Sequence, residues 1–408
     1  MSWIYPFTEE VEGPFSIAEK LKSTHANLPS PPPPSRPITI SIVGAGQRGS
    51  LYAQFANIEP KWAQVVAVAE PVEHRRNAMA ELYNIPKENV FTKWEDMIEC
   101  PKLSDAVIIS TLDNLHVDPL VAFADKKYHI LLEKPMAINI EGCVKITDAI
   151  VKNEVLFAVG HVLRYTPHNI LVKEIIDAGY LGNIVNIQHA EHVGFWHFAH
   201  SYVRGNWRNE AGSSFSLMTK KVSSFGSLMH FNSENKPKEA ENGLDKGVRS
   251  WPVNVVTDIV DIENLEKNLI NGPYGKCVYE SDNDVVDNQV VNLEFKNGST
   301  ANITMIAYTE AITERKKEIL VPTNILGVED LSGHAGGDMA LMRAFIYSVN
   351  ESFDTSKDTK NSNDNPYIKT GIQQALHSHL CVFAAEHSRK TGETVSIQDY
   401  KKMKGIED

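Results

Sequence analysis

Over residues 37–160, short apolar runs alternate with segments whose apolar residues recur at helical spacing. The apolar runs, which are typical of buried parallel strands, occur at 38–43, 63–69, 105–110, 128–132 and 157–160. Helical spacing follows at 51–58, 79–82 and 119–125. Strands and helices in alternation predict an α/β domain with a parallel, doubly wound sheet.

The pattern changes after residue 160, where longer β-forming runs dominate. They occur at 184–193, 285–295 and 299–308, and Asn297-Gly298 separates the last two. Asn-Gly between two strands is a strong hairpin signal, because both central residues of the turn must take positive φ. A closing segment, 372–388, has apolar residues on one helical face. We therefore predict an α+β domain over residues 161–408, with a largely antiparallel open sheet.

Two segments lack these patterns. Residues 1–36 lead into a proline-rich run, 29–37, that cannot continue a helix, so we expect an N-terminal arm and a stiff linker. Residues 350–365 carry almost no apolar side chains and predict a solvated loop.

The chain has 408 residues and a formal net charge of −12, and its Lys and Arg residues form no cluster. This charge disfavours nucleic acids and anionic membranes as partners. The four cysteines show no metal-ligand spacing, and no apolar run is long enough to span a bilayer. We expect a cytoplasmic protein with reduced thiols, no bound metal and no secretory signal.

The first apolar run leads into a glycine-rich loop, Gly44-Ala45-Gly46-Gln47-Arg48-Gly49, and a helical pattern follows it. Glycines at this spacing between a strand and a helix are the fingerprint of a Rossmann-type dinucleotide-binding fold. Gly44 would make the tight turn, Gly46 would let a pyrophosphate approach the backbone, and Gly49 would let helix and strand pack closely. The phosphates would then lie against N–H groups at the helix N-terminus. A glycine-rich turn in an unrelated α/β protein is the alternative.

Glu70 follows the second apolar run, about twenty residues after the last glycine of the loop. A carboxylate at this place typically accepts hydrogen bonds from the adenosine ribose hydroxyls, and it would repel a 2′-phosphate. The sequence therefore favours NAD over NADP, although Arg75 and Arg76 follow closely and could bind a phosphate.

Polar residues also follow the third and fourth apolar runs, at the edge where open parallel sheets bind ligands. They are Thr111, Asn114 and His116 after the third run, and Glu133, Lys134 and Pro135 after the fourth. Lys134 is placed to face a nicotinamide and its substrate, and Pro135 would fix the turn. A solvated lysine in a surface turn is the alternative interpretation.

Three motifs resemble those of the Gfo/Idh/MocA family, which is named after glucose-fructose oxidoreductase and inositol dehydrogenase. They are GAGQRG after the first strand, EKPMA after the fourth, and GHVLRYTP at residues 160–167. Similar segments at 200–210, 272–291 and 332–338 extend the resemblance from about residue 37 to residue 400. It implies an NAD(P)-dependent oxidoreductase that transfers hydride to or from a secondary alcohol or ketone of a sugar, polyol or derivative.

The resemblance also implies roles for individual residues. Lys134 would be catalytic, contacting the substrate and assisting proton transfer, and a cis peptide bond would precede Pro135. The cofactor would contact Gly44, Ala45, Gly46, Gln47, Arg48, Gly49, Glu70, Thr111, Asn114, His116, Glu133, Lys134 and Pro135. The substrate would contact Arg164, Tyr165, Trp196, Tyr202, Arg204, Trp207 and Arg208, with His192 as a further pocket residue. A buried packing role is the alternative for each of these side chains, and the open second sheet would form a homo-oligomer.

The chain departs from the family at one catalytic segment. In the family, the segment like 217–220 continues into a helix with a general acid/base histidine, whereas here Lys220 leads directly into a segment that resembles the one after that helix. Segments 235–251 and 318–333 are also shortened. A base must still take the hydroxyl proton, and the candidates are Lys134, His161, His192, His197 and His230. The sequence is a shortened gene model or a divergent member, and a catalytically impaired nucleotide-binding sensor is the alternative function.

Overall fold

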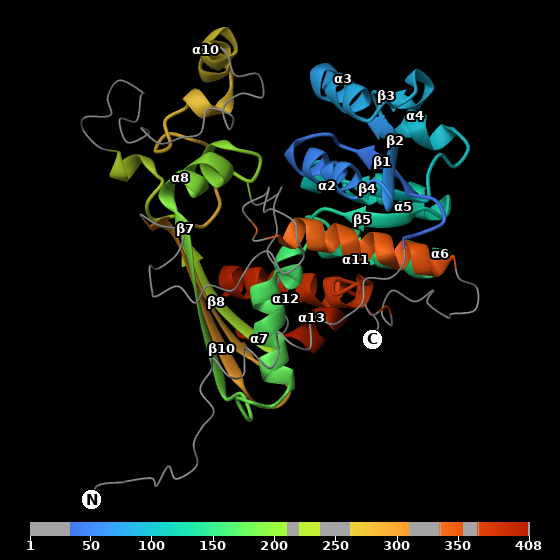
Figure 1. Cartoon of the computed structure of the whole chain (residues 1–408). Helices are drawn as coiled ribbons and strands as arrows, with labels where there is room; N and C mark the ends of the chain where they lie inside the picture. The colour runs from blue at the N-terminus through green and yellow to red at the C-terminus, as the bar shows by residue number, and fades with distance from the viewer. Residues whose placement is uncertain are drawn as a thin grey trace, which may run out of the picture.

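The computed structural model describes residues 33–209, 220–236, 262–309, 334, 336–353, 365 and 367–406. Two sheets form its framework, one in each half of the chain (Figure 1). The expected N-terminal arm, the polar segment 350–365 and the shortened segments at 217–220, 235–251 and 318–333 lie wholly or mostly outside the described residues.

The first sheet is parallel throughout and has the strand order β3-β2-β1-β4-β5-β6. Its strands are β1 (Ile38–Val43), β2 (Ala63–Ala69), β3 (Val90–Phe91), β4 (Ala106–Ile109), β5 (His129–Leu132) and β6 (Phe157–Val159). This order is that of a doubly wound Rossmann sheet, so the predicted fold of the first half is confirmed. The prediction missed β3, because two half-buried residues at a sheet edge give no recognisable pattern.

Helices cover both faces of this sheet. They and the short helical turns of this half are α2 (Gln47–Ile58), α3 (Glu73–Leu82), η1 (Lys87–Asn89), α4 (Trp94–Glu99), η2 (Asp113–Leu115), α5 (Val117–Asp125) and α6 (Ile140–Asn153). Helix α2 begins four residues earlier than predicted, directly after Gly46. It shares one apolar core with β1 and with α11 (Gly337–Ser352), which comes from near the C-terminus (Figure 1). Because α11 packs on the first sheet, a domain boundary at residue 160 stays a prediction.

The second sheet has the strand order β11-β8-β9-β10-β7. Its strands are β7 (Asn186–Gly194), β8 (Lys221–Ser227), β9 (Asn288–Glu294), β10 (Thr300–Thr309) and β11 (Val395–Ser396). Only β10 and β7 pair in parallel, which confirms the largely antiparallel sheet. Helix α12 (Ile372–Thr391) packs on β8 and on α6, so it joins the two halves through a common core.

The hairpin between β9 and β10 differs from the prediction. Gly298 has φ of 85°, but Asn297 does not have positive φ, so the expected turn with two such residues was wrong. The Phe295 carbonyl accepts a hydrogen bond from Gly298 N–H at 3.0 Å, and Phe295 N–H donates to the Ser299 carbonyl at 2.9 Å. The loop therefore has three residues, with glycine in the left-handed position that completes the turn.

The second half of the chain also contains several helices and short helical turns. They are η3 (Val162–Tyr165), α7 (Pro167–Asp177), α8 (Phe195–Phe198), the π-helical turn η4 (Ala199–Arg204), η6 (Ser233–Asn235), α10 (Ile262–Asn271), η8 (Pro273–Gly275) and α13 (Ile397–Met403). No helix in the described part of the chain combines the length and apolar character needed to cross a lipid bilayer.

Candidate active site at the edge of the first sheet

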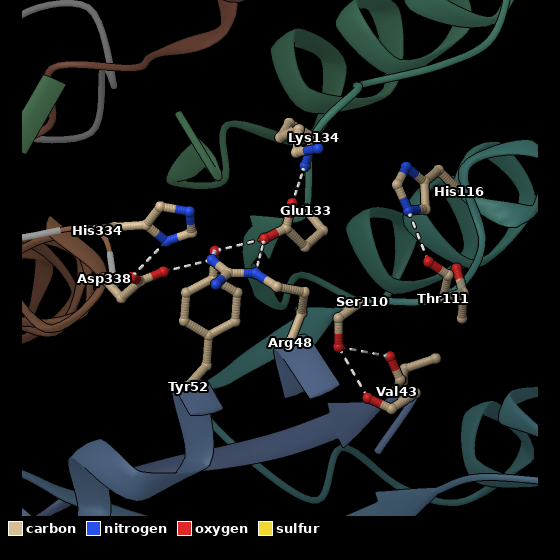
Figure 2. Close-up of polar contacts among 11 residues, drawn as sticks. Val43, Arg48, Tyr52, Ser110, Thr111, His116, Glu133, Lys134, His334 and Asp338 are labelled. Carbon is tan, nitrogen blue, oxygen red and sulfur yellow. Dashed lines mark hydrogen bonds and ion pairs between the residues drawn. The ribbon is translucent and has the colours of Figure 1, made fainter. Parts of the chain in front are cut away.

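The glycine loop after β1 is closely packed at its two ends. Gly44 has φ of 90°, and a Cβ there would lie 2.6 Å from the Ser110 carbonyl oxygen. A Cβ on Gly49 would lie 1.9 Å from the Gly44 carbonyl oxygen. The Ser110 hydroxyl donates to that same oxygen at 2.8 Å, and Figure 2 shows Ser110 pointing at the loop. Neither glycine can be replaced without moving the backbone, in agreement with the roles predicted for them.

The middle of the loop is open. A Cβ on Gly46 would meet no neighbouring atom nearer than Arg75 Nη1, at 3.8 Å. Gly46 is the N-cap of α2, and the first N–H groups of a helix have no partners within the helix. A side chain at this position would fill the space in front of those N–H groups. The loop therefore fits the pyrophosphate of a dinucleotide, which needs close backbone approach and a helix N-terminus.

Glu70, at the end of β2, helps to shape this loop. Its side chain is buried, and its two oxygens accept hydrogen bonds from Ala45 N–H at 2.7 Å and Val72 N–H at 2.9 Å. Arg76 Nη1 donates to the Glu70 carbonyl at 2.7 Å. A contact between Glu70 and a ribose stays a prediction, whereas its contact with the loop backbone belongs to the fold.

Arg48, which was predicted to face the cofactor, turns into the protein (Figure 2). Its Nε donates to Glu133 at 2.5 Å and its Nη2 donates to Asp338, at the start of α11, at 2.5 Å. Tyr52 donates to the same Glu133 oxygen at 2.8 Å. Burial alone would lower the pKa of Arg48, but Glu133, Tyr52 and Asp338 together raise it well above its usual value. His334 contacts the other Asp338 oxygen at 2.8 Å. We name these five residues the ionic network.

The turn that carries Lys134 is held from several sides. Glu133 accepts a hydrogen bond from Lys134 N–H at 2.6 Å, and the peptide bond between Lys134 and Pro135 is cis, as the resemblance implies. His116 is fully buried and bonds the Pro135 carbonyl at 2.8 Å and the Thr111 carbonyl at 3.2 Å. It therefore joins the loops after β4 and β5, and Figure 2 shows its contact with Thr111.

His379, on α12, holds the next residue of this turn. It accepts a hydrogen bond from Met136 N–H at 2.9 Å through Nε2. Burial lowers the pKa of His379 to about 4, so the ring is neutral and keeps this acceptor. The backbone around Lys134 is thus fixed by both halves of the chain.

The side chain of Lys134 meets two residues from distant segments. Its Nζ lies 4.3 Å from the centroid of the Trp207 ring, and the Trp207 indole N–H donates to Asp113 at 2.8 Å. Asp113 lies in η2, which follows β4 at the same sheet edge. Burial raises the pKa of Asp113 to about 6, against the opposing effects of Lys134 and the indole bond. Asp113 was not among the predicted site residues, although an acid directly after a predicted strand was a usable signal.

Aromatic side chains continue from Trp207 along one side of this site. Tyr202 lies 5.3 Å from Trp207, and His197 lies 6.3 Å from Tyr202 and 5.5 Å from Trp196, between ring centroids. Burial raises the pKa of Tyr202 to about 12. The predicted substrate residues Trp196, Tyr202 and Trp207 are therefore brought together with Lys134 by the fold.

The predicted arginines and Tyr165 make their hydrogen bonds and ion pairs with other segments of the chain. Tyr165 is buried, and its hydroxyl bonds Thr370 Oγ1 at 3.0 Å and accepts from Lys369 N–H at 2.9 Å. Buried Arg204 donates to the Tyr274 carbonyl at 2.8 Å. For these two residues the packing role is the better interpretation, and we no longer propose them as substrate contacts. Arg164 donates to the Lys369 carbonyl, and Arg208 pairs with Asp282.

The candidate histidines differ in their surroundings. The His161 ring stacks on His379 at 5.9 Å, and burial lowers the pKa of His161 to about 3. His230 stacks on Tyr308 at 4.7 Å between ring centroids. His192 lies on β7. His197 faces Lys134, whose charge joins burial in lowering the pKa of this histidine.

Comparisons with known proteins agree with this geometry. Residues 38–161 match the profile of an oxidoreductase family described as having an NAD-binding Rossmann fold. The 2,7-anhydro-N-acetylneuraminate hydratase of Escherichia coli K12 is 30% identical over 149 residues, which are 36% of this chain and 38% of that protein. The inositol 2-dehydrogenase of Rubrobacter xylanophilus is 29% identical over 149 residues, 36% of this chain and 42% of that protein. The chain thus spans about two fifths of the length of these curated relatives.

Solved structures match over a longer part of the chain. An inositol dehydrogenase homolog complexed with NAD+ from Azotobacter vinelandii has a TM-score of 0.61 at 13% identity, over 89% of this chain and 98% of that one. The WlbA dehydrogenase from Bordetella pertussis, in complex with NADH and UDP-GlcNAcA, has a TM-score of 0.59 at 13% identity, over 88% and 99%. At these identities the likeness concerns the fold.

Proposed function

Because residues 38–161 belong to the Gfo/Idh/MocA oxidoreductase family, we propose that this protein transfers hydride between NAD(P) and a secondary alcohol or ketone. The substrate would be a sugar, polyol or derivative. One observation carries the proposal: the open cradle at Gly46 and the Lys134 turn lie at the same edge of one parallel sheet. Ligands of such sheets bind at this edge.

The glycine loop and the N-terminus of α2 would hold the cofactor, with Glu70 keeping the loop in shape. When bound, the nicotinamide supplies the hydride acceptor or donor. We favour NAD, since a buried carboxylate ends β2 where a 2′-phosphate would lie. Arg75, beside Gly46, is the residue that would favour NADP, so both dinucleotides belong in the test.

The chain's own residues would orient and polarise the substrate. The Lys134 ammonium would stabilise negative charge on the reacting oxygen, as a fixed cation does at a developing alkoxide. The faces of Trp207, Tyr202 and Trp196 would pack against the apolar face of a sugar or polyol ring. The buried Glu133 and His116 would keep Lys134 in position by holding its backbone.

We extend the proposal to assembly and location. The outer face of the second sheet exposes apolar surface, with Phe225 at 60% of full exposure beside half-buried Val290 on β9, so this face would pair with another copy. The four cysteines are free thiols, which suits the reducing cytosol.

A catalytically impaired nucleotide-binding sensor is the second candidate. The observation that favours it is the direct passage from Lys220 to Lys221, where related sequences carry the acid/base histidine helix. A sensor would bind the dinucleotide but would turn over no alcohol.

The deciding experiment incubates the full chain with NAD or NADP and a panel of polyols, sugars and sugar acids. Nicotinamide absorbance reports hydride transfer in both directions. Turnover that is lost in Lys134→Met supports the oxidoreductase. Dinucleotide binding without turnover on any substrate would support the sensor instead.

A further inference from the structure

Trp207 contacts both Lys134 and Asp113, and the proposed function gives Asp113 no role. The three come from the segment after η4, the turn after β5 and the turn η2. The indole ring contacts both the ammonium and the carboxylate, at 4.3 Å from ring centroid to Nζ and 2.8 Å from Nε1 to Oδ2. A cation and an acid are thus held at one sheet edge, where the substrate oxygen would lie.

The charged and titratable groups that face Asp113 are few within the described residues. Lys134 and Glu133 act from the turn after β5, and Tyr202 acts from η4. Lys134 and the indole bond favour the carboxylate, whereas burial and Glu133 favour the acid, and the pKa of Asp113 becomes about 6. A carboxyl group with this pKa exchanges a proton readily at neutral pH.

The other groups near Lys134 are poorer bases. His161 holds no proton above its pKa of about 3, so it is too weak a base at neutral pH. Tyr202 keeps its proton up to its pKa of about 12. His197 faces Lys134, but it has no hydrogen bond to Lys134, Trp207 or Asp113. It is the rival that an experiment must exclude.

We propose that Asp113 is the proton acceptor of the site, in the place of the absent histidine helix. This inference rests on the proposed oxidoreductase function. In the oxidation direction the substrate O–H bond breaks and its proton passes to an Asp113 oxygen. The electron pair of the adjacent C–H bond leaves with its hydrogen as hydride, and an oxidised nicotinamide dinucleotide takes it up. The ketone forms beside the Lys134 ammonium, and Asp113 releases its proton to water.

The first test is Asp113→Asn, because the amide oxygen can still accept the Trp207 hydrogen bond but takes up no proton. We expect the oxidation rate to fall by about 10²- to 10⁴-fold, while dinucleotide affinity stays within about twofold. The wild-type rate should rise with pH through about 6, since the carboxylate is the active form. The variant should lose this rise, which we call the acidic limb of the rate profile. Asp118→Asn, an exposed carboxylate in the next helix, is the matched control.

A second readout needs neither cofactor nor substrate. Tryptophan fluorescence of the cofactor-free protein should change with a midpoint near pH 6, because the Trp207 indole bonds the titrating carboxylate. Asp113→Asn and Trp207→Phe should abolish the change, and Asp118→Asn should keep it. If Asp113→Asn does not fold, Trp207→Phe serves in its place. It removes a bond that stabilises the carboxylate and should move the rate limb to higher pH.

The outcomes separate this inference from the function on which it rests. Wild-type turnover with an unchanged rate and pH profile in Asp113→Asn would overturn Asp113 as the acceptor and leave the oxidoreductase intact. Loss of the limb in His197→Gln with Asp113→Asn unaffected would assign the role to His197. No wild-type turnover on any substrate would overturn the function, and this inference with it.

Discussion

The two sheets of this molecule bury their strands in different ways. The central strands of the first sheet are covered on both faces, so that Ile40, Ile108 and Leu131 have no measurable exposure. Among the residues that the structure describes, α12 covers one face of the second sheet, and on β8 buried Val222 alternates with exposed Phe225. A sheet covered on both faces leaves only its edge for chemistry, and that edge carries the glycine loop, Asp113 and Lys134. A sheet covered on one face leaves its other face as a surface that another molecule can contact.

The largest expected effect tests how tightly the covered sheet constrains its loop. Gly49→Ala places a methyl group 1.9 Å from the Gly44 carbonyl oxygen. We expect a loss of about 3 kcal/mol in the free energy of unfolding, and more if the backbone cannot shift. Chemical denaturation measures it.

Gly46→Ala is the matched control, since its Cβ would have room. It should unfold like the wild type but bind dinucleotide at least about tenfold more weakly, because the methyl fills the phosphate cradle. Equal destabilisation of the two variants would show that the loop is not packed as described.

The next prediction compares buried and exposed charges. Arg48→Met leaves Glu133 and Asp338 buried without their cation, and breaking such a network costs about 3 kcal/mol. Lys220→Met removes one partner of an exposed pair with Glu294 on the second sheet and should leave the denaturation midpoint unchanged. Similar losses for both variants would contradict the buried character of the ionic network.

Much of the difference between the two sheets could be predicted from the sequence. Contiguous signals were sufficient for five strands of the first sheet, all except β3, and for the glycine loop, because apolar runs and glycine spacing are local. The contact between Trp207 and Asp113 joins residues 94 positions apart, and the contact between Arg48 and Asp338 joins residues 290 positions apart. No local pattern encodes such pairs. Arg48 was assigned to the cofactor for this reason, because its partner lies at the other end of the chain.

A smaller effect depends on pH. Burial alone would raise the pKa of Asp105, but hydrogen bonds from Arg36 and Thr39 lower it to about 2, from 3.8. The folded-state pKa lies below the unfolded one, so the carboxylate stabilises the fold above about pH 4, and this contribution is lost as the pH falls from about 4 to 2.

Asp105→Asn should therefore cost about 1 to 2 kcal/mol at pH 7 and progressively less below pH 4. Urea denaturation at a series of pH values measures it. Asp177→Asn, in the exposed pair with Lys173 on α7, is the control. It should change neither the free energy of unfolding at pH 7 nor its dependence on pH. A pH-independent loss in Asp105→Asn would show that the carboxylate's charge is not what stabilises the fold.

The smallest effect on stability concerns the half-covered sheet. Phe225→Ser removes an apolar side chain that is 60% exposed and should alter the melting temperature of the isolated chain very little. If this face joins two copies, the variant should dissociate in analytical ultracentrifugation at concentrations where the wild type is assembled. A wild type that sediments as a monomer would rule out that use of the face.

Calorimetric titration of the full chain with NAD, NADH, NADP and NADPH tests the central claim, that the covered sheet binds a nicotinamide dinucleotide at its edge. We predict one site per chain with a dissociation constant between about 1 μM and 1 mM, tighter for NAD than for NADP and weakened in Gly46→Ala. Absence of binding by all four dinucleotides in the folded protein would contradict both the oxidoreductase and the sensor.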